Sequence, residues 1–80
     1  MATVRDRVIA VTSRVLKVPP EEIKPEHHFA ADLGAESVQS LELVAGFEDE
    51  FDIEMEEDAA LQVQSVGKAV EFIQRHLEER

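Results

Sequence analysis

The sequence predicts an all-α fold, a small four-helix bundle of three main helices and one short helix, with a long loop between the first two helices. Apolar residues recur at helical steps of three and four in three separate segments, and no stretch alternates as a half-buried strand does. All three prolines fall between the first two of these segments. The 80 residues form one domain, 1–80, whose core is too small to enclose a large active site as well.

The first helix is marked by a valine stripe with steps of four, three, four and three residues, at Val4, Val8, Val11, Val15 and Val18. One face of an α-helix has this period. Thr3 followed by Asp6 resembles a capping box with Asp in place of Glu. Pro19 and Pro20 cannot donate a backbone hydrogen bond, and residues before proline avoid the α region. A helix from about Thr3 to about Lys17 follows.

Residues 19–36 form the long loop, with a short turn expected around Glu21–Ile23. Ile23, Phe29 and Leu33 are its apolar residues, and we expect them to pin it across the helices. Long connections inside compact domains are commonly functional or packed by their own side chains.

The second helix is expected from about Ser37 to about Phe51. Its residues predict a broad apolar face made of Val38, Leu41, Leu43, Val44, Ala45, Phe47 and Phe51. They predict a polar face on the opposite side made of Gln39, Glu42, Gly46, Asp49 and Glu50.

Two helices follow in the C-terminal third. The acids of residues 54–58, followed by Ala59-Ala60-Leu61, suit the N-terminus of a short helix because they complement its dipole. Ser65 is placed to cap the last helix. The apolar stripe of that helix is Val66, Val70, Ile73 and Leu77.

The chain is strongly acidic, with 18 Asp and Glu against 8 Lys and Arg and a formal net charge of −10. No Lys or Arg occurs between Pro25 and Gly67. Ten acids fall between Glu36 and Asp58. Such a chain repels nucleic acid and anionic membranes and attracts basic protein surfaces. The acidic stretch is either a solvated face or a docking surface for cationic partners, and charge alone does not decide between them.

Several classes of protein are disfavoured. Without Cys the chain has no disulfide or thiolate metal cluster, and its apolar runs fall far short of the about 20 residues of a membrane-spanning helix. The N-terminal residues lack the apolar region of a signal peptide, so a cytoplasmic location is the default expectation. The chain is also expected to be a monomer. His27 and His28 are interpreted as loop residues, with His28 near the core, because two neighbouring histidines make a poor metal site.

The sequence also argues against a calcium-binding loop and a hydrolase. An EF-hand loop needs glycine at its sixth position. Loops that start at Asp49 or Asp52 place Glu54 or Glu57 there, so the pattern fails and no metal site is expected. No spacing joins a nucleophile to an orienting base and acid, so no catalytic residue is predicted.

The segment 32–43, read as DLGAESVQSLEL, carries the most specific pattern. It resembles the modification loop of acyl carrier proteins, which reads D-L-G-A/G-D-S-L before an acidic amphipathic helix, and the resemblance covers nearly the whole chain. Serine is a favoured N-cap residue in any helix. A phosphate on Ser37 would sit beside unpaired N–H groups at the positive end of the helix dipole. Gly34 would give the preceding turn conformational freedom and leave room for a modifying enzyme.

The resemblance implies that a phosphopantetheinyl transferase attaches 4′-phosphopantetheine from coenzyme A to Ser37, with Gly34 and Glu36 flanking the site. The terminal thiol then carries acyl groups as thioesters to enzymes of fatty-acid or polyketide-type synthesis, and the protein itself is not an enzyme. Partners of this family offer basic patches to the helix after the serine. The matching positions here are Glu36, Val38, Glu42, Glu48 and Asp49. The basic residues of the first helix are interpreted as solubilising: Arg5, Arg7, Arg14 and Lys17.

The chain departs from the family pattern at four positions: Glu36, Val38, Gln39 and Gly46. None of these removes the serine, and together they indicate a specialised carrier. The alternative is an unmodified acidic helical module that binds a basic partner through the same helix. The hydroxyl of Ser37 within its motif argues against that alternative.

Overall fold

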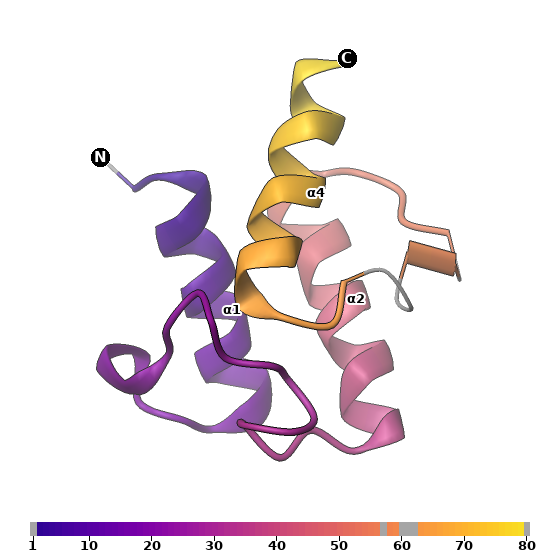
Figure 1. Cartoon of the computed structure of the whole chain (residues 1–80). Helices are drawn as coiled ribbons and strands as arrows, with labels where there is room; N and C mark the ends of the chain where they lie inside the picture. The colour runs from indigo at the N-terminus through magenta and orange to yellow at the C-terminus, as the bar shows by residue number, and fades with distance from the viewer. Residues whose placement is uncertain (1, 57, 60–62, 80) are drawn as a thin grey trace.

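The computed structural model describes residues 2–56, 58–59 and 63–79. Within these ranges the elements are α1 (Val4–Leu16), the 3₁₀ turn η1 (Pro20–Glu22), α2 (Ser37–Phe51) and α4 (Val66–Glu78) (Figure 1). The all-α prediction is confirmed, since the described residues contain no strand and only one antiparallel bridge, between His28 and Ser65. The expected short helix lies partly outside the described residues. Of its described residues, Asp58 and Ala59 are helical.

The predicted boundaries of α1 are confirmed by its caps. The Thr3 hydroxyl accepts the Asp6 N–H at 3.1 Å, and the Asp6 carboxylate accepts the Thr3 N–H at 3.2 Å. This is the predicted capping box, and it satisfies two backbone donors reciprocally. At the other end Lys17 takes a left-handed conformation with φ 58° and donates its N–H to Ser13 O. The chain then turns into Pro19 and η1.

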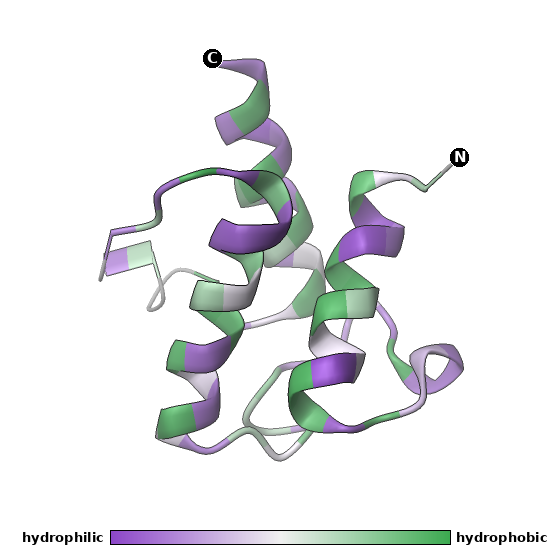
Figure 2. Ribbon diagram, turned by 180° about the vertical axis from the view of Figure 1, so that it is seen from behind, coloured by the Kyte–Doolittle hydropathy of each residue, from purple (hydrophilic) through white to green (hydrophobic). Residues whose placement is uncertain are grey.

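The three long helices enclose one core, with α1 packed against both α2 and α4. Figure 2 shows apolar residues along all three of these helices. The buried apolar residues of these helices are Val8 and Val11 of α1, Leu43, Phe47 and Phe51 of α2, and Val66, Ala69 and Ile73 of α4. Of the expected loop anchors, Ile23 and Phe29 are buried and Leu33 is half-buried.

Backbone hydrogen bonds hold the long loop against the start of α4. Phe29 N–H donates to Gln64 O at 2.9 Å, Val66 N–H to His27 O at 3.0 Å, and Gly67 N–H to Pro25 O at 2.9 Å. A Cβ on Gly67 would lie 3.1 Å from the Pro25 carbonyl oxygen, so glycine permits this close approach. The loop is thereby fixed beside α2 and α4.

The predicted faces of α2 are partly wrong. Val38 and Leu41 are 65 % and 66 % exposed, and Ala45 is exposed too, although all three were assigned to the apolar face. Gly46, assigned to the polar face, points at α1, where a Cβ would lie 2.8 Å from Val11 Cγ1. The helix therefore carries two apolar stripes. The stripe of Leu43, Phe47 and Phe51 faces the core, and the stripe of Val38 and Leu41 faces outward. The sequence pattern alone does not choose between them.

Arg7 does not serve as a solubilising residue. Its Nε donates to Glu50 Oε2 at 2.8 Å, and its Nη2 donates to the Glu50 backbone carbonyl. Its guanidinium lies 4.4 Å from the centre of the Phe51 ring. Arg7 therefore joins α1 to the end of α2, and Glu50 faces α1 rather than the predicted polar side.

Candidate functional site

A tight turn precedes α2. Leu33 N–H donates to His28 O at 3.1 Å, Gly34 N–H to Ala30 O at 3.2 Å, and Ala35 N–H to Phe29 O at 2.8 Å. Gly34 has φ 74°, in the left-handed region that residues with a Cβ rarely adopt. No heavy atom lies within 4 Å of where its Cβ would be. The predicted conformational freedom at Gly34 is thus in use, and the surface above it is open.

Asp32 fixes the base of this turn. Its carboxylate accepts the His28 N–H at 2.7 Å and lies 3.4 Å from His28 Nδ1. The backbone hydrogen bond from His28 is the main cause that lowers the pKa of Asp32, because it stabilises the ionised form. The side chain of His28 is exposed, so the expectation that it packs near the core is wrong.

Ser37 is the first residue of α2 but not its cap. Glu36 occupies the N-cap position, and Gln39 Oε1 accepts the Glu36 N–H at 2.9 Å. Gln39 thus plays the part that the N3 residue has in a capping box. Ser37 therefore does not cap the helix, as an ordinary serine at a helix start often does. Its exposed side chain stands beside first-turn N–H groups that have no partner inside the helix.

A cavity of about 480 Å³ opens beside Ser37, between α2, the loop and residues 63–64. Polar residues at this cavity are His28, Ser37, Ser40 and Gln64. Apolar residues complete its lining, chiefly Phe29, Leu43, Val44, Phe47 and Val63. The serine therefore stands at the mouth of an apolar space, a feature that sequence periodicity did not reveal.

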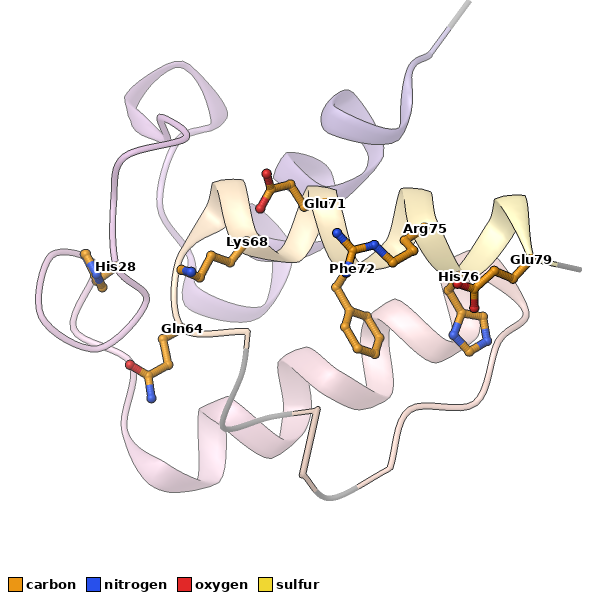
Figure 3. Close-up of a pocket in the computed structure, with 8 residues that line it drawn as sticks. All are labelled: His28, Gln64, Lys68, Glu71, Phe72, Arg75, His76 and Glu79. Carbon is orange, nitrogen blue, oxygen red and sulfur yellow. The ribbon is translucent and has the colours of Figure 1, made fainter.

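A second hollow of about 590 Å³ runs along α4 (Figure 3). Lys68 and Arg75 contribute positively charged side chains to its lining. Phe72 stacks on His76 there, with ring centroids 6.1 Å apart. It shares His28 and Gln64 with the cavity beside Ser37. It holds none of the residues predicted to bind a cofactor, so the smaller cavity is the one associated with the candidate site.

The predicted partner surface is only partly available. Glu36, Val38, Glu42 and Asp49 are exposed. Glu48 is half-buried, and its carboxylate accepts the Met55 N–H at 3.0 Å, so it holds the segment after α2 in place. Sequence reasoning missed an exposed residue: Leu41, three positions after Val38, lies on the same side of the helix.

The part of the chain that the structure describes offers neither a metal cluster nor a membrane-spanning helix. No group of three or more His, Cys, Asp or Glu side chains there could hold a metal ion. None of the helices there is both long and apolar enough to cross a bilayer.

Comparison with known proteins agrees with this geometry. Residues 6–73 match the family described as phosphopantetheine attachment site. The acyl carrier protein of Phenylobacterium zucineum (strain HLK1) is 46 % identical over 77 residues, covering 96 % of this chain and 98 % of that protein. The acyl carrier protein of Caulobacter vibrioides (strain NA1000 / CB15N) is 44 % identical over 73 residues, covering 91 % and 94 %. The chain therefore belongs to the acyl carrier protein family, in which 4′-phosphopantetheine is attached covalently to the protein.

Proposed function

We propose that Ser37 is the residue that carries 4′-phosphopantetheine and that the exposed side of α2 presents the loaded arm to partner enzymes. The family is one of carriers and not of enzymes, so the chain's own residues hold and orient a group rather than transform it. The observation that carries the proposal is the cap of α2: Glu36 and Gln39 satisfy the helix end, which leaves the Ser37 hydroxyl out of the cap.

The residues around Ser37 fit a phosphodiester. The first turn of the 15-residue helix α2 points backbone N–H groups and the positive end of its dipole at this position. The open surface above Gly34 gives a transferase access to the hydroxyl from the side of the turn. The hydrogen bonds of the turn hold the backbone that leads to Ser37 in one conformation, which lowers the entropic cost of docking.

The attached group supplies a thiol, to which acyl chains are bound as thioesters. The chain's own contribution is the cavity of about 480 Å³ beside Ser37. Its apolar lining can cover an acyl chain and exclude water from it, in the way that apolar pockets bury ligand surface. The enzymes served are those of fatty-acid or polyketide-type synthesis, which act on such thioesters.

The docking surface on α2 consists of Val38 and Leu41 flanked by Glu36, Glu42 and Asp49, all exposed. An apolar pair ringed by acids suits a partner that presents an apolar contact within a basic patch. Single exposed ion pairs contribute only about 0–1 kcal/mol. Several together speed the encounter and fix its orientation without making release slow, as a carrier requires.

Charge reversal tests the docking surface. Glu42→Lys should slow modification by a phosphopantetheinyl transferase at low salt, and added salt should narrow the difference from the native chain. Glu71→Lys makes the same charge change at an exposed position on α4, away from this surface, and should have a smaller effect. Equal slowing by the two variants would show that net charge, and not this surface, governs docking.

We also propose that the chain works as a cytoplasmic monomer. Its net charge of −10 opposes association between identical copies. Sedimentation equilibrium at physiological salt should give the mass of one chain, and a concentration-dependent dimer would contradict this part of the proposal.

A further inference from the structure

We propose that Gln39 is a positioning residue for the group on Ser37. Its side chain closes the start of α2 with a neutral amide, so that the phosphodiester, and not a protein carboxylate, supplies the negative charge at this helix end. The proposal rests on the proposed function, in which Ser37 carries the arm. It assigns a role to one of the positions at which the chain departs from the family pattern.

The hydrogen bond from Glu36 fixes which way the Gln39 amide faces. The backbone N–H of Glu36 donates to Gln39 Oε1 at 2.9 Å. Because a backbone N–H can only donate, the amide oxygen must take this position, and Nε2 with its N–H donors lies on the other branch of the amide. Glu36 directly precedes Ser37 in the chain. An oriented and uncharged polar group is therefore held beside the residue next to the attachment serine.

A carboxylate at position 39 would close the same cap. The capping box takes Glu as well as Gln at its third helical position, and α1 shows an acidic version, in which Asp6 accepts the Thr3 N–H at 3.2 Å. The helix dipole also favours acids at a helix N-terminus. Yet the first turn of α2 contains no acid, in a chain with 18 Asp and Glu. Capping alone therefore does not account for the amide.

The charges around Ser37 supply a reason. Glu36 and Glu42 carry exposed carboxylates on either side of it in the sequence. Among the described residues, no Lys or Arg lines the cavity beside Ser37. A phosphodiester on Ser37 is an anion, so it enters a region that already carries negative charge and offers it no Lys or Arg at the cavity.

The backbone of the first turn is then what can balance the phosphate. Ser40 N–H donates to Glu36 O at 2.9 Å, which is the first bond inside the helix. The N–H groups that precede it have no acceptor within the helix. A carboxylate at position 39 would compete for these groups and would repel the phosphate. Gln39 closes the cap without either effect, and it leaves these N–H groups to the phosphodiester.

The test compares the unmodified chain with the loaded form, which carries the arm with a free thiol on Ser37. Both forms are prepared for the native sequence and for Gln39→Glu, which keeps the cap and adds a carboxylate. The change in melting temperature on loading should be lower in Gln39→Glu than in the native chain by about 1–8 °C at low salt, as expected for one charge near a helix end in a domain of this size. Added salt should narrow the difference. An equal change on loading in both chains would overturn the proposal.

Two matched variants identify the cause. Gln74→Glu makes the same charge change at an exposed position of α4 and should leave the change on loading as it is in the native chain. Gln39→Ala removes the cap without adding charge, so it should lower the melting temperature of both forms and leave the change on loading near the native value. If Gln74→Glu acts as strongly as Gln39→Glu, net charge is the cause. If Gln39→Ala does so, the cap is the cause. Either result refutes the proposal.

A second measurement needs no variant. In the ¹⁵N-labelled native chain, the side-chain amide resonances of Gln39 should move when Ser37 is loaded, and those of Gln74 should not. Gln39 resonances that stay in place would show that its amide does not sense the phosphate, and would overturn the proposal.

Mass spectrometry of each preparation separates this proposal from the proposed function. If Ser37 accepts no arm in the native chain, the proposed function fails and the role of Gln39 fails with it. If Ser37 is loaded and the change in melting temperature is the same in the native chain and in Gln39→Glu, the role of Gln39 alone is refuted.

Discussion

Arg7 and Glu50 join the start of α1 to the end of α2 through two hydrogen bonds from one guanidinium, at Glu50 Oε2 (2.8 Å) and at the Glu50 backbone carbonyl. The contact places a cation at the C-terminal end of α2, where the helix dipole is negative and acids are concentrated. It also occupies the Glu50 carboxylate, so Glu50 does not belong to the docking surface proposed on α2.

Replacing Arg7 should therefore destabilise the fold. The two side chains are 38 % and 33 % exposed, so the ion pair contributes at most about 1 kcal/mol, and the contact with Phe51 adds about 0.5–1 kcal/mol. Arg7→Met should lower the melting temperature by about 4–8 °C for each kcal/mol lost, measured by circular dichroism. Arg5→Met removes an exposed cation from the same turn of α1 and should change it little. Equal losses would contradict this role of Arg7.

The close approach of α1 and α2 at Gly46 predicts an unusual response to alanine. Alanine normally stabilises a helix interior by about 1 kcal/mol relative to glycine. Here its Cβ would meet Val11 Cγ1 at 2.8 Å, and overpacking of this kind costs about 1–3 kcal/mol. We expect Gly46→Ala to lower the free energy of unfolding in urea titrations. In a Val11→Ala background the same change should become neutral or stabilising. Equal effects in both backgrounds would rule out the clash.

Gly34 should tolerate substitution according to backbone conformation and not size, because space above it is open while its φ is 74°. Asparagine visits the left-handed region and β-branched residues avoid it. Gly34→Val should therefore lose more stability than Gly34→Asn, by about 1 kcal/mol or more, and should be modified more slowly at Ser37. Thermal melts and the time course of modification provide both readouts. The reverse order would indicate that side-chain volume matters here.

The Asp32 carboxylate should make a small contribution to the loss of folding stability at low pH. Its pKa is lowered, chiefly by the His28 backbone hydrogen bond, so the ionised form is favoured in the folded state. The stabilisation is complete above the unfolded pKa of about 3.9 and is lost as the pH falls through the lower folded pKa. NMR titration of the Asp32 carboxyl carbon should give a midpoint below 3.9, and Asp32→Asn should flatten the stability profile below that pH. A midpoint at or above 3.9 would contradict the hydrogen bond.

Local rules predicted the elements well, and the reason is visible in particular residues. Thr3 with Asp6, Pro19 and Ser65 act on their own neighbours in the chain, so their effects can be inferred from the sequence; the Ser65 hydroxyl accepts the Lys68 N–H at 3.2 Å, as a cap does. Gln39, three residues after Glu36, was the local signal that Ser37 is not the cap, and the capping-box pattern could have revealed it.

The features that the sequence did not predict correctly depend on contacts between residues far apart in the sequence. Gly46 faces Val11, and Arg7 meets Glu50, 43 residues later. No period within α2 encodes which of its two apolar stripes α1 will cover. The same holds for the cavity beside Ser37, which requires the loop, α2 and residues 63–64 to come together.

The central claim is that Ser37, freed from the helix cap, holds the prosthetic group. The direct measurement is tandem mass spectrometry of the chain after incubation with coenzyme A, Mg²⁺ and a broad-specificity phosphopantetheinyl transferase, beside Ser37→Ala and Ser40→Ala. Ser40 is the neighbouring serine at the same cavity. We predict one phosphopantetheine at Ser37 in the native chain and in Ser40→Ala, and none in Ser37→Ala. A folded native chain that gains no group, or a Ser37→Ala variant that gains one, would contradict the account.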